Sequence, residues 1–262
     1  MFGCVYNMPV AFFLKENKMI KKSDTNEVYH SQTGISASGL KIIFQQSLFH
    51  YLNFKPKKAT TAMNFGTAVH SVVLGDTSTP IVVLPEINAR TTAGKIEKHE
   101  FMKANEGSTI ITKAEHEGIE MIMDNLNEHT EAKELIESCN EIEKSYYLEY
   151  EGVPVRIRPD GLQLDKFILD VKTTSNSNPH SFRNDIYRFC YHLQGVFYSD
   201  MLGYEAETFK FVAIENKHPY NIEVYSLGEE LVDRGRKAWQ IAFSKYKRFF
   251  DTGELVKEST AL

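Results

Sequence analysis

Cysteine is scarce in this sequence, and its few occurrences are far apart. Cys4, Cys139 and Cys190 lack metal-ligand spacing, and their number is odd. A structural zinc site or a cysteine-ligated iron–sulfur cluster needs four ligands in characteristic spacings, which are not available here. We therefore interpret the three cysteines as reduced packing residues and expect a cytoplasmic protein.

Long apolar runs are also missing. The apolar stretch from Met8 to Leu14 is short, no basic residue precedes it, and several lysines follow it. A membrane-spanning helix needs about 20 predominantly apolar residues, and a signal peptide begins with a basic segment. We expect neither a signal peptide nor contact with a membrane.

Positive charge is not in excess, because 30 Lys and Arg face 35 Asp and Glu and the net charge is -5. Any nucleic-acid contact must therefore come from a local basic surface. A glycine-rich phosphate loop of the Walker type is absent from the sequence, so no use of ATP is expected.

The remaining composition is that of a globular protein, with 262 residues, 42% hydrophobic and 25% charged. Such a chain can bury one large core or two small ones. Residues 1–34 show weak patterning, and the rest contains no repeat, low-complexity tract or convincing linker. We expect a weakly ordered N-terminal extension over residues 1–34, followed by a single domain over residues 35–262.

Helical patterns dominate the first half of that domain. Ser36 or Ser38 can cap a helix from Leu40 to Leu52 with one apolar stripe. A second helix is predicted from Ala62 to Leu74, where small residues allow a close approach by a neighbour. Two further helices are predicted over residues 113–128 and 131–137.

Strand patterns begin at residue 141. Residues 141–150 alternate, Glu151-Gly152 forms a turn, and residues 153–162 and 167–172 continue the sheet. Helices are expected over residues 179–189, 191–202 and 228–250, and further strands over residues 209–214 and 222–225. The predicted fold class is α/β (α+β), with a central mixed sheet flanked by helices and a helical N-terminal part.

The candidate site centres on two of these strands. Asp160 lies in Arg-Pro-Asp-Gly on one strand, and Asp170 and Lys172 lie in Ile-Leu-Asp-Val-Lys on the next. Because side chains alternate along a strand, Asp170 and Lys172 share a face while Val171 points into the core. Two carboxylates and an ammonium at one sheet edge suit a hard divalent cation and a phosphodiester.

Four basic residues could contact phosphate or pair with acids. Arg90 and Lys95 open a helix, where anions are favoured, although a solvated loop is an equal alternative. Arg158 and Arg156 are predicted on the same strand face as Asp160, so Arg158 could pair with it or contact phosphate.

Other candidates lie on helices. His70 sits among apolar residues and, from the local pattern alone, is interpreted as a histidine at the edge of the core. Tyr191, Gln194 and Tyr198 are three and four residues apart and share a helix face. They either line the site or seal the helix against the sheet.

Together these motifs resemble the PD-(D/E)XK nuclease signature, and more narrowly the exonuclease VIII (RecE-like) family of phage recombination nucleases. The resemblance rests on the two acidic motifs and extends over nearly the whole chain from about Tyr29. Its remaining motifs are Ile35-Ser36-Ala37-Ser38-Gly39-Leu40, Gly66-Thr67-Ala68-Val69-His70, Arg90-Thr91-Thr92-Ala93-Gly94-Lys95, Lys172-Thr173-Thr174 and Tyr191-His192-Leu193-Gln194.

The resemblance implies a role for each matching residue. His70, Asp160, Asp170 and the carbonyl of Val171 would hold Mg²⁺, and Lys172 would orient and polarise the attacking water. Because a histidine nitrogen is softer than Mg²⁺ requires, Mn²⁺ should substitute. The implied DNA contacts are made by Gln194 and Tyr191.

The resemblance also implies an activity and partners. These are ATP-independent 5′-to-3′ digestion of linear duplex DNA, single-stranded 3′ tails for a RecT-type annealing protein, and a ring-shaped homotetramer. Two alternatives stay open. One is an endonuclease of the same superfamily, and the other is a non-catalytic scaffold that binds DNA ends, against which the intact Asp160, Asp170 and Lys172 argue.

Overall fold

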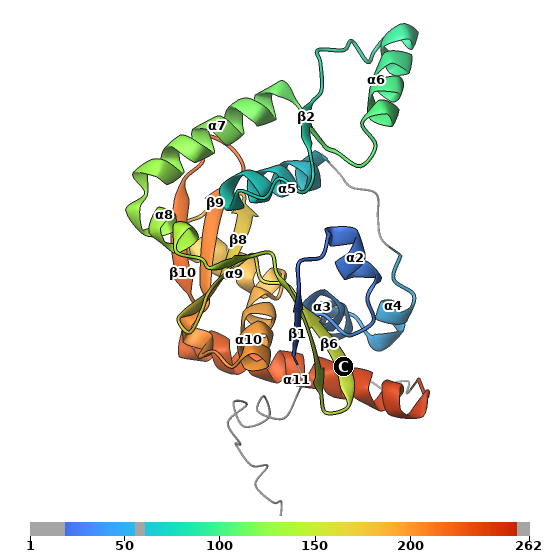
Figure 1. Ribbon diagram of the computed structural model, residues 1–262, viewed down its shortest axis with the longest axis vertical. Helices are drawn as coiled ribbons and strands as arrows, with labels where there is room; N and C mark the ends of the chain where they lie inside the picture. The colour runs from blue at the N-terminus through green and yellow to red at the C-terminus, as the bar shows by residue number, and fades with distance from the viewer. Residues whose placement is uncertain (1–18, 56–60, 256–262) are drawn as a thin grey trace, which may run out of the picture.

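The computed structural model describes residues 19–55 and 61–255, and it shows a central mixed sheet with helices packed on both faces (Figure 1). This is the fold class predicted from the sequence. Among the described residues, no helix is both long enough and apolar enough to cross a bilayer.

The elements follow the chain in two groups. The first half is mainly helical: β1 Ile20–Lys22, α2 Asn26–Ser31, α3 Ala37–Gln45, α4 Leu48–Leu52, α5 Thr61–Leu74, β2 Ile81–Val83, α6 Thr92–Ala104, β3 Thr109–Ile111, α7 Lys113–Glu128 and α8 Thr130–Glu137. The second half contains the main sheet: β4 Glu141–Ile142, β5 Ser145–Tyr150, β6 Val153–Ile157, β7 Gly161–Gln163, β8 Phe167–Thr174, α9 Pro179–Arg188, α10 Tyr191–Leu202, a 3₁₀ turn Ala206–Thr208, β9 Lys210–Glu215, β10 Ile222–Ser226 and α11 Glu229–Thr252.

The main sheet has the strand order β10-β9-β8-β7-β4. β8 and β9 are parallel and are connected through α9 and α10, whereas the other pairs are antiparallel. Alternate residues of β8 enter different cores. Ile168 packs with residues of α10 and α11, and Leu169 and Val171 pack with residues of α5 and α7. Because of this alternation, Asp170 faces α10.

The long strands predicted over residues 141–150 and 153–162 are each interrupted, and this is a correction. The first strand is interrupted between β4 and β5, and the second between β6 and β7. At these points the chain passes between the main sheet and a second sheet of order β1-β5-β6. Glu143 has a φ of 46° at the first break, and its backbone N–H donates to the carbonyl of Asp160 at the second, at 3.0 Å. We call these paired breaks the seam. Asp160 and Arg158 therefore lie in the seam and not within a strand.

The helix predicted from Leu40 to Leu52 is also interrupted. Ser36 caps α3 as expected, and its hydroxyl accepts a hydrogen bond from the backbone of Gly39. Ser47 then caps α4 by accepting from the backbone of His50, at 3.2 Å. A serine hydroxyl competes with helix continuation in this way, so the helix restarts at Leu48.

The close approach predicted at α5 is present. A Cβ built on Gly66 would lie 3.2 Å from the Oγ1 of Thr173, which is tighter than an ordinary contact. A side chain at this position would push α5 away from β8. The glycine thus lets His70, one turn further along α5, come close to the backbone of β8.

The N-terminal extension lies partly outside the described residues, as do Cys4 and the apolar stretch from Met8 to Leu14. Residues 19–34 form β1, which pairs with β5, and α2, which buries Tyr29. The part of the expected extension that is described therefore packs onto the domain.

The other two cysteines are free, as expected. Cys190 is buried, and the half-buried Cys139 packs against the core, where burial raises the pKa of its thiol to about 11. Both are packing residues.

α6 projects from the body of the molecule on two connecting segments (Figure 1). Those segments contain β2 and β3, which form a small parallel pair. Strand β3 is not anticipated by the sequence pattern, because three residues are too few to show a period. We call β2, α6 and β3 the arm.

Candidate active site

A cleft of about 440 Å³ lies where α2, α5, the seam, β8 and α10 meet. Its lining includes His70, Asp160, Val171, Lys172 and Gln194. Residues separated by more than one hundred positions in the sequence thus share one depression of the surface.

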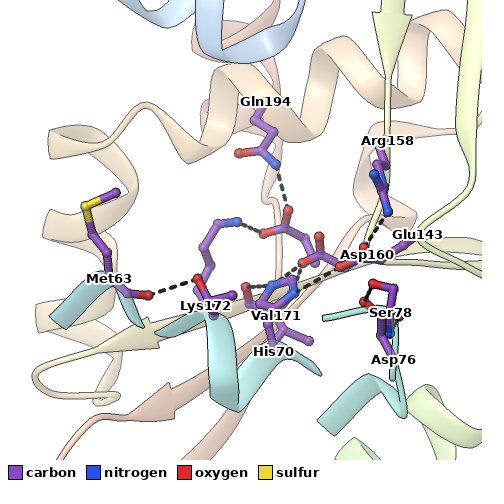
Figure 2. A network of polar contacts seen from close by, with 12 residues as sticks. Met63, His70, Asp76, Ser78, Glu143, Arg158, Asp160, Val171, Lys172 and Gln194 are labelled. Carbon is purple, nitrogen blue, oxygen red and sulfur yellow. Dashed lines mark hydrogen bonds and ion pairs between the residues drawn. The ribbon is translucent and has the colours of Figure 1, made fainter. Parts of the chain in front are cut away.

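The polar face of β8 borders the cleft, where Lys172 is a lining residue and Asp170 is buried, with 1% of its surface exposed. The ammonium of Lys172 forms an ion pair with Oδ2 of Asp170. Gln194 donates from Nε2 to Oδ1 of the same carboxylate, at 2.7 Å (Figure 2). Burial raises the pKa of Asp170, and the charge of Lys172 only partly opposes this effect. Burial also acts to lower the pKa of Lys172, but the two carboxylates outweigh it and the pKa is raised. Lys172 therefore remains protonated.

Asp160 and His70 meet on the other side of the cleft. Oδ2 of Asp160 accepts a hydrogen bond from the backbone of Val171 at 2.7 Å and lies 2.8 Å from Nε2 of His70. Burial opposes the charge on His70, but Asp160 outweighs it and raises the pKa of the imidazole to about 10. The same pairing outweighs burial at Asp160 and lowers the pKa of its carboxyl.

The donor set fits a divalent cation in part. Nε2 of His70 lies 3.0 Å from the carbonyl oxygen of Val171 and 2.8 Å from Oδ2 of Asp160. Neighbouring ligands of an octahedral Mg²⁺ with bonds of 2.0–2.1 Å are about 3 Å apart. Hard oxygens and one imidazole thus stand at ligand spacing, although no three His, Cys, Asp or Glu side chains gather as a metal centre within the described ranges. Asp170, the fourth predicted ligand, contacts Lys172 and Gln194.

Glu143 and Arg158 flank this pair. Nη2 of Arg158 donates to Oε2 of Glu143 at 2.7 Å, and Oε1 of Glu143 lies 3.7 Å from Nδ1 of His70. Arg158 therefore pairs with Glu143 and not with Asp160, which corrects one of its predicted contacts. Its Nε and Nη1 are buried and find no hydrogen-bond partner among the described residues, so they remain able to donate.

Arg156 does not line the cleft, although its guanidinium and that of Arg158 both lie near the ring of Tyr29. It donates to the backbone carbonyls of Gly34 and Tyr29, and its guanidinium lies 5.0 Å from the ring of Tyr29.

The predicted face of α10 lies along the cleft. Tyr191, Gln194 and Tyr198 all line it, and the backbone of Arg158 hydrogen-bonds to the hydroxyl of Tyr198. The ammonium of Lys172 lies 5.1 Å from the ring centre of Tyr191. These side chains therefore face the site, so sealing α10 against the sheet is not their only role.

Lys41 on α3 is a member of the site that the sequence pattern did not single out. It donates to Oε1 of Gln194 at 2.6 Å and lies 5.2 Å from the ring centre of Tyr191. Its one sequence signal is a lysine between Leu40 and Ile42, in the apolar part of the helix. That signal is weak, because lysine stems commonly cover apolar surface.

Arg90 and Lys95 are not part of the cleft. Arg90 precedes α6, Lys95 lies in its first turn, and both are exposed on the arm. The structure thus places them on a separate surface of the molecule.

Comparison with known proteins identifies the family of this chain. A family model described as a PDDEXK-like domain of unknown function (DUF3799) matches residues 36–259. The chain belongs to this family. The DUF3799 match places it in the PD-(D/E)XK superfamily, as the motifs around Asp160 and Lys172 predicted. No curated protein matches the chain.

A solved structure resembles this DUF3799 member in fold. A protein from Eubacterium rectale, provisionally named an exonuclease, superposes with a TM-score of 0.58 at 14% identity, covering 92% of this chain and 97% of its own. A second structure, SSO0001, matches with a TM-score of 0.27 at 14% identity, covering 67% of this chain and 84% of its own. The first match supports the architecture, and the second carries no argument.

Proposed function

We propose that this protein is a metal-dependent, ATP-independent exonuclease that hydrolyses phosphodiester bonds of linear duplex DNA. The observation that carries the proposal is the meeting of two groups in one cleft. Lys172, Asp170 and Gln194 form one group, and His70 and Asp160 with the Val171 carbonyl form the other. General binding of DNA does not require such a buried set of charges.

Each group has a chemical task in this proposal. His70, Asp160 and the Val171 carbonyl would hold Mg²⁺ or Mn²⁺, which when bound supplies Lewis-acid polarisation of the phosphate. Lys172 holds a positive charge beside the position of the attacking water and orients it. Gln194 fixes the carboxylate of Asp170, so the ammonium of Lys172 has a defined direction.

Arg158 offers a further phosphate contact. Its Nε and Nη1 are unsatisfied within the described part of the chain, while Glu143 holds Nη2. A guanidinium anchored at one nitrogen can donate its other N–H groups to a phosphate oxygen without large loss of side-chain entropy.

The finer assignment rests on family resemblance. We infer 5′-to-3′ polarity, production of 3′ tails, cooperation with a RecT-type annealing protein and a ring-shaped tetramer from the likeness to exonuclease VIII. The name given to the Eubacterium rectale neighbour supports an exonuclease over an endonuclease.

A digestion assay tests the proposal. The purified protein is incubated with linear duplex and with closed circular DNA, in Mg²⁺, in Mn²⁺ and in EDTA. We expect linear DNA to disappear from its ends only with metal, and circles to persist. Rapid linearisation of circles would favour an endonuclease, and no metal-dependent loss of either substrate would overturn the proposal.

Matched substitutions on one hairpin assign the activity to the site. Asp170→Asn and Lys172→Ala should each reduce the rate by at least about 100-fold, since preorganised charge at the reacting centre is removed. Asp165→Asn and Lys166→Ala lie in the exposed turn between β7 and β8 and should retain activity. Equal rates for all four purified variants would contradict the assignment.

A further inference from the structure

Two stacked aromatic rings lie between two cations, from the cleft to the protein surface. The ammonium of Lys172 lies 5.1 Å from the ring centre of Tyr191. The ring of Tyr191 stacks on that of Phe189 with centroids 5.5 Å apart and an interplanar angle of 29°. The guanidinium of Arg188 lies 5.2 Å from the ring centre of Phe189. We call these four residues the ladder.

The outer part of the ladder is open to solvent. Tyr191 lines the cleft, whereas Phe189 is 42% exposed and Arg188 is also exposed. Covering a water-exposed phenylalanine ring with a flat apolar group is energetically favourable. The ring therefore offers a stacking surface next to the proposed reaction centre.

The backbone holds this surface in place. Cys190 joins α9 to α10 in the left-handed conformation, with φ 50° and ψ 44°, which is uncommon for a residue other than glycine. The side-chain amide of Gln45 donates to the carbonyl of Arg188 at 2.7 Å, and the backbone N–H of Phe189 donates to the backbone carbonyl of Asp185 at 2.9 Å. Strained conformations held by surrounding contacts are typical of ligand-binding positions.

The chemistry of the ladder selects one kind of occupant. Single-stranded nucleic acid is bound by basic groups that follow its backbone and by aromatic rings on which successive bases stack. Arg188 and Lys172 provide positive charge at the two ends. An apolar protein segment would gain nothing from these charges.

We propose that Phe189 is a base-stacking subsite for a nucleotide adjacent to the scissile phosphate, with Arg188 contacting the neighbouring backbone. This inference rests on the proposed function, because the strand that stacks is the one whose phosphate reaches the cleft. It adds that a separated strand, and not an intact duplex, occupies the outer part of the cleft.

Binding without hydrolysis tests the subsite. Fluorescence anisotropy in EDTA measures the affinity of a labelled ten-nucleotide thymidine oligomer for the full chain. Stacking is worth about 1–3 kcal/mol per base, so Phe189→Ala should weaken binding by roughly 5- to 150-fold. Phe189→Trp should retain affinity. Phe49→Ala, which removes another exposed phenylalanine on α4, should leave affinity unchanged.

An abasic oligomer separates stacking from general loss of contact. A series of oligomers each lacks one base, at successive positions. At one position, the missing base should weaken binding to the wild type but have little effect on binding to Phe189→Ala. Equal affinities of wild type and Phe189→Ala, or equal abasic penalties at every position, would overturn the inference. Circular dichroism confirms that the variant is folded.

The two proposals can fail separately. Binding that depends on Phe189 without any metal-dependent cleavage would leave the subsite in place and overturn the nuclease assignment. Normal cleavage with unchanged affinity of Phe189→Ala would leave the nuclease assignment in place and overturn the subsite.

Discussion

Lys41 differs from the other cations of the cleft because its hydrogen-bond acceptor is neutral. It donates to the amide oxygen of Gln194, which in turn donates to Asp170. Burial lowers the pKa of Lys41 to about 7, and the nearby charge of Lys172 adds to the effect. The contact orients the amide, since the N–H₂ end of Gln194 must then face Asp170. Lys41 is thus a positioning residue.

Substitution of Lys41 should therefore affect the chemical step more than binding. Loss of a residue that orients a catalytic group typically reduces activity by about 10- to 100-fold. We expect Lys41→Met to lower kcat within this range with a smaller change in KM, and Lys41→Arg to recover part of the loss. Steady-state kinetics on linear duplex DNA measure both. Lys144→Met, whose side chain contacts Ser23 away from the cleft, is the control. A rise in KM alone would argue against the positioning role.

The pair of His70 and Asp160 predicts a pH dependence of stability. The pKa of His70 is raised to about 10 in the folded protein, above its unfolded value near 6.5. A raised pKa contributes stability that is complete below the unfolded value and declines as the pH rises toward the folded value. The contribution should therefore fall between about pH 6.5 and 10 in metal-free protein.

Urea denaturation in EDTA at pH 6.5 and pH 9 measures this effect. The difference in unfolding free energy between wild type and His70→Gln should shrink by roughly 1 kcal/mol or more at the higher pH. The comparison with the variant is needed because the lowered pKa of Lys41 makes both proteins more stable as the pH rises, which opposes the effect of His70. A difference that is constant or grows with pH would contradict the proposed pairing.

At the scale of elements, the seam explains what the sequence pattern could and could not predict. The turn at Glu151-Gly152 and the hairpin of β7 and β8 follow from local turn chemistry, and both are present. The breaks at Glu143 and between β6 and β7 do not follow from it. The alternation of apolar and polar residues continues through both breaks, because the segments on the two sides of each break are both half-buried, although in different sheets. Only the tertiary pairing of Glu143 with Asp160 reveals the switch.

The same reason limits prediction of the site. Asp160, Asp170 and Lys172 could be found because they lie within one short motif. The pattern around His70 was that of a core histidine, and it became a candidate ligand only through family resemblance. Lys41 carries only a weak local signal, and Phe189 carries none. Their roles depend on the packing of α3 against α10 and on the conformation of Cys190.

Because Arg90 and Lys95 lie on the arm, we expect them to contact duplex DNA outside the cleft. Each phosphate contact made by a basic side chain steepens the salt dependence of DNA affinity by about one unit of logarithmic slope. We expect the double substitution of Arg90→Ala and Lys95→Ala to weaken duplex binding and to reduce that slope by about two. Hydrolysis of a short oligonucleotide should be unchanged, because neither residue lines the cleft. An unaltered salt slope would indicate a solvated arm.

At the scale of the whole molecule, the cleft joins parts that otherwise pack separately. α5 belongs to the core on one face of the main sheet, and α10 belongs to the core on the other. β8 supplies side chains to both cores, and the seam connects the main sheet to the second sheet. The geometry of the site therefore depends on how these parts pack together.

Metal binding should consequently stabilise the whole fold. A ligand that binds only the folded state stabilises it by RT ln(1 + [L]/Kd), about 2.7 kcal/mol when its concentration is 100 times Kd. For a protein of this size, 1 kcal/mol corresponds to about 2–4 °C in Tm. We expect Mn²⁺ at saturating concentration to raise Tm by several degrees, and EDTA to reverse the shift. Differential scanning fluorimetry measures it. His70→Gln and Asp160→Asn should lose the shift, whereas Asp76→Asn at the rim of the same cleft should keep it. An equal shift in all three variants would mean that the metal binds elsewhere, because Nε2 of His70 lies 3.0 Å from the Val171 carbonyl oxygen and 2.8 Å from Oδ2 of Asp160.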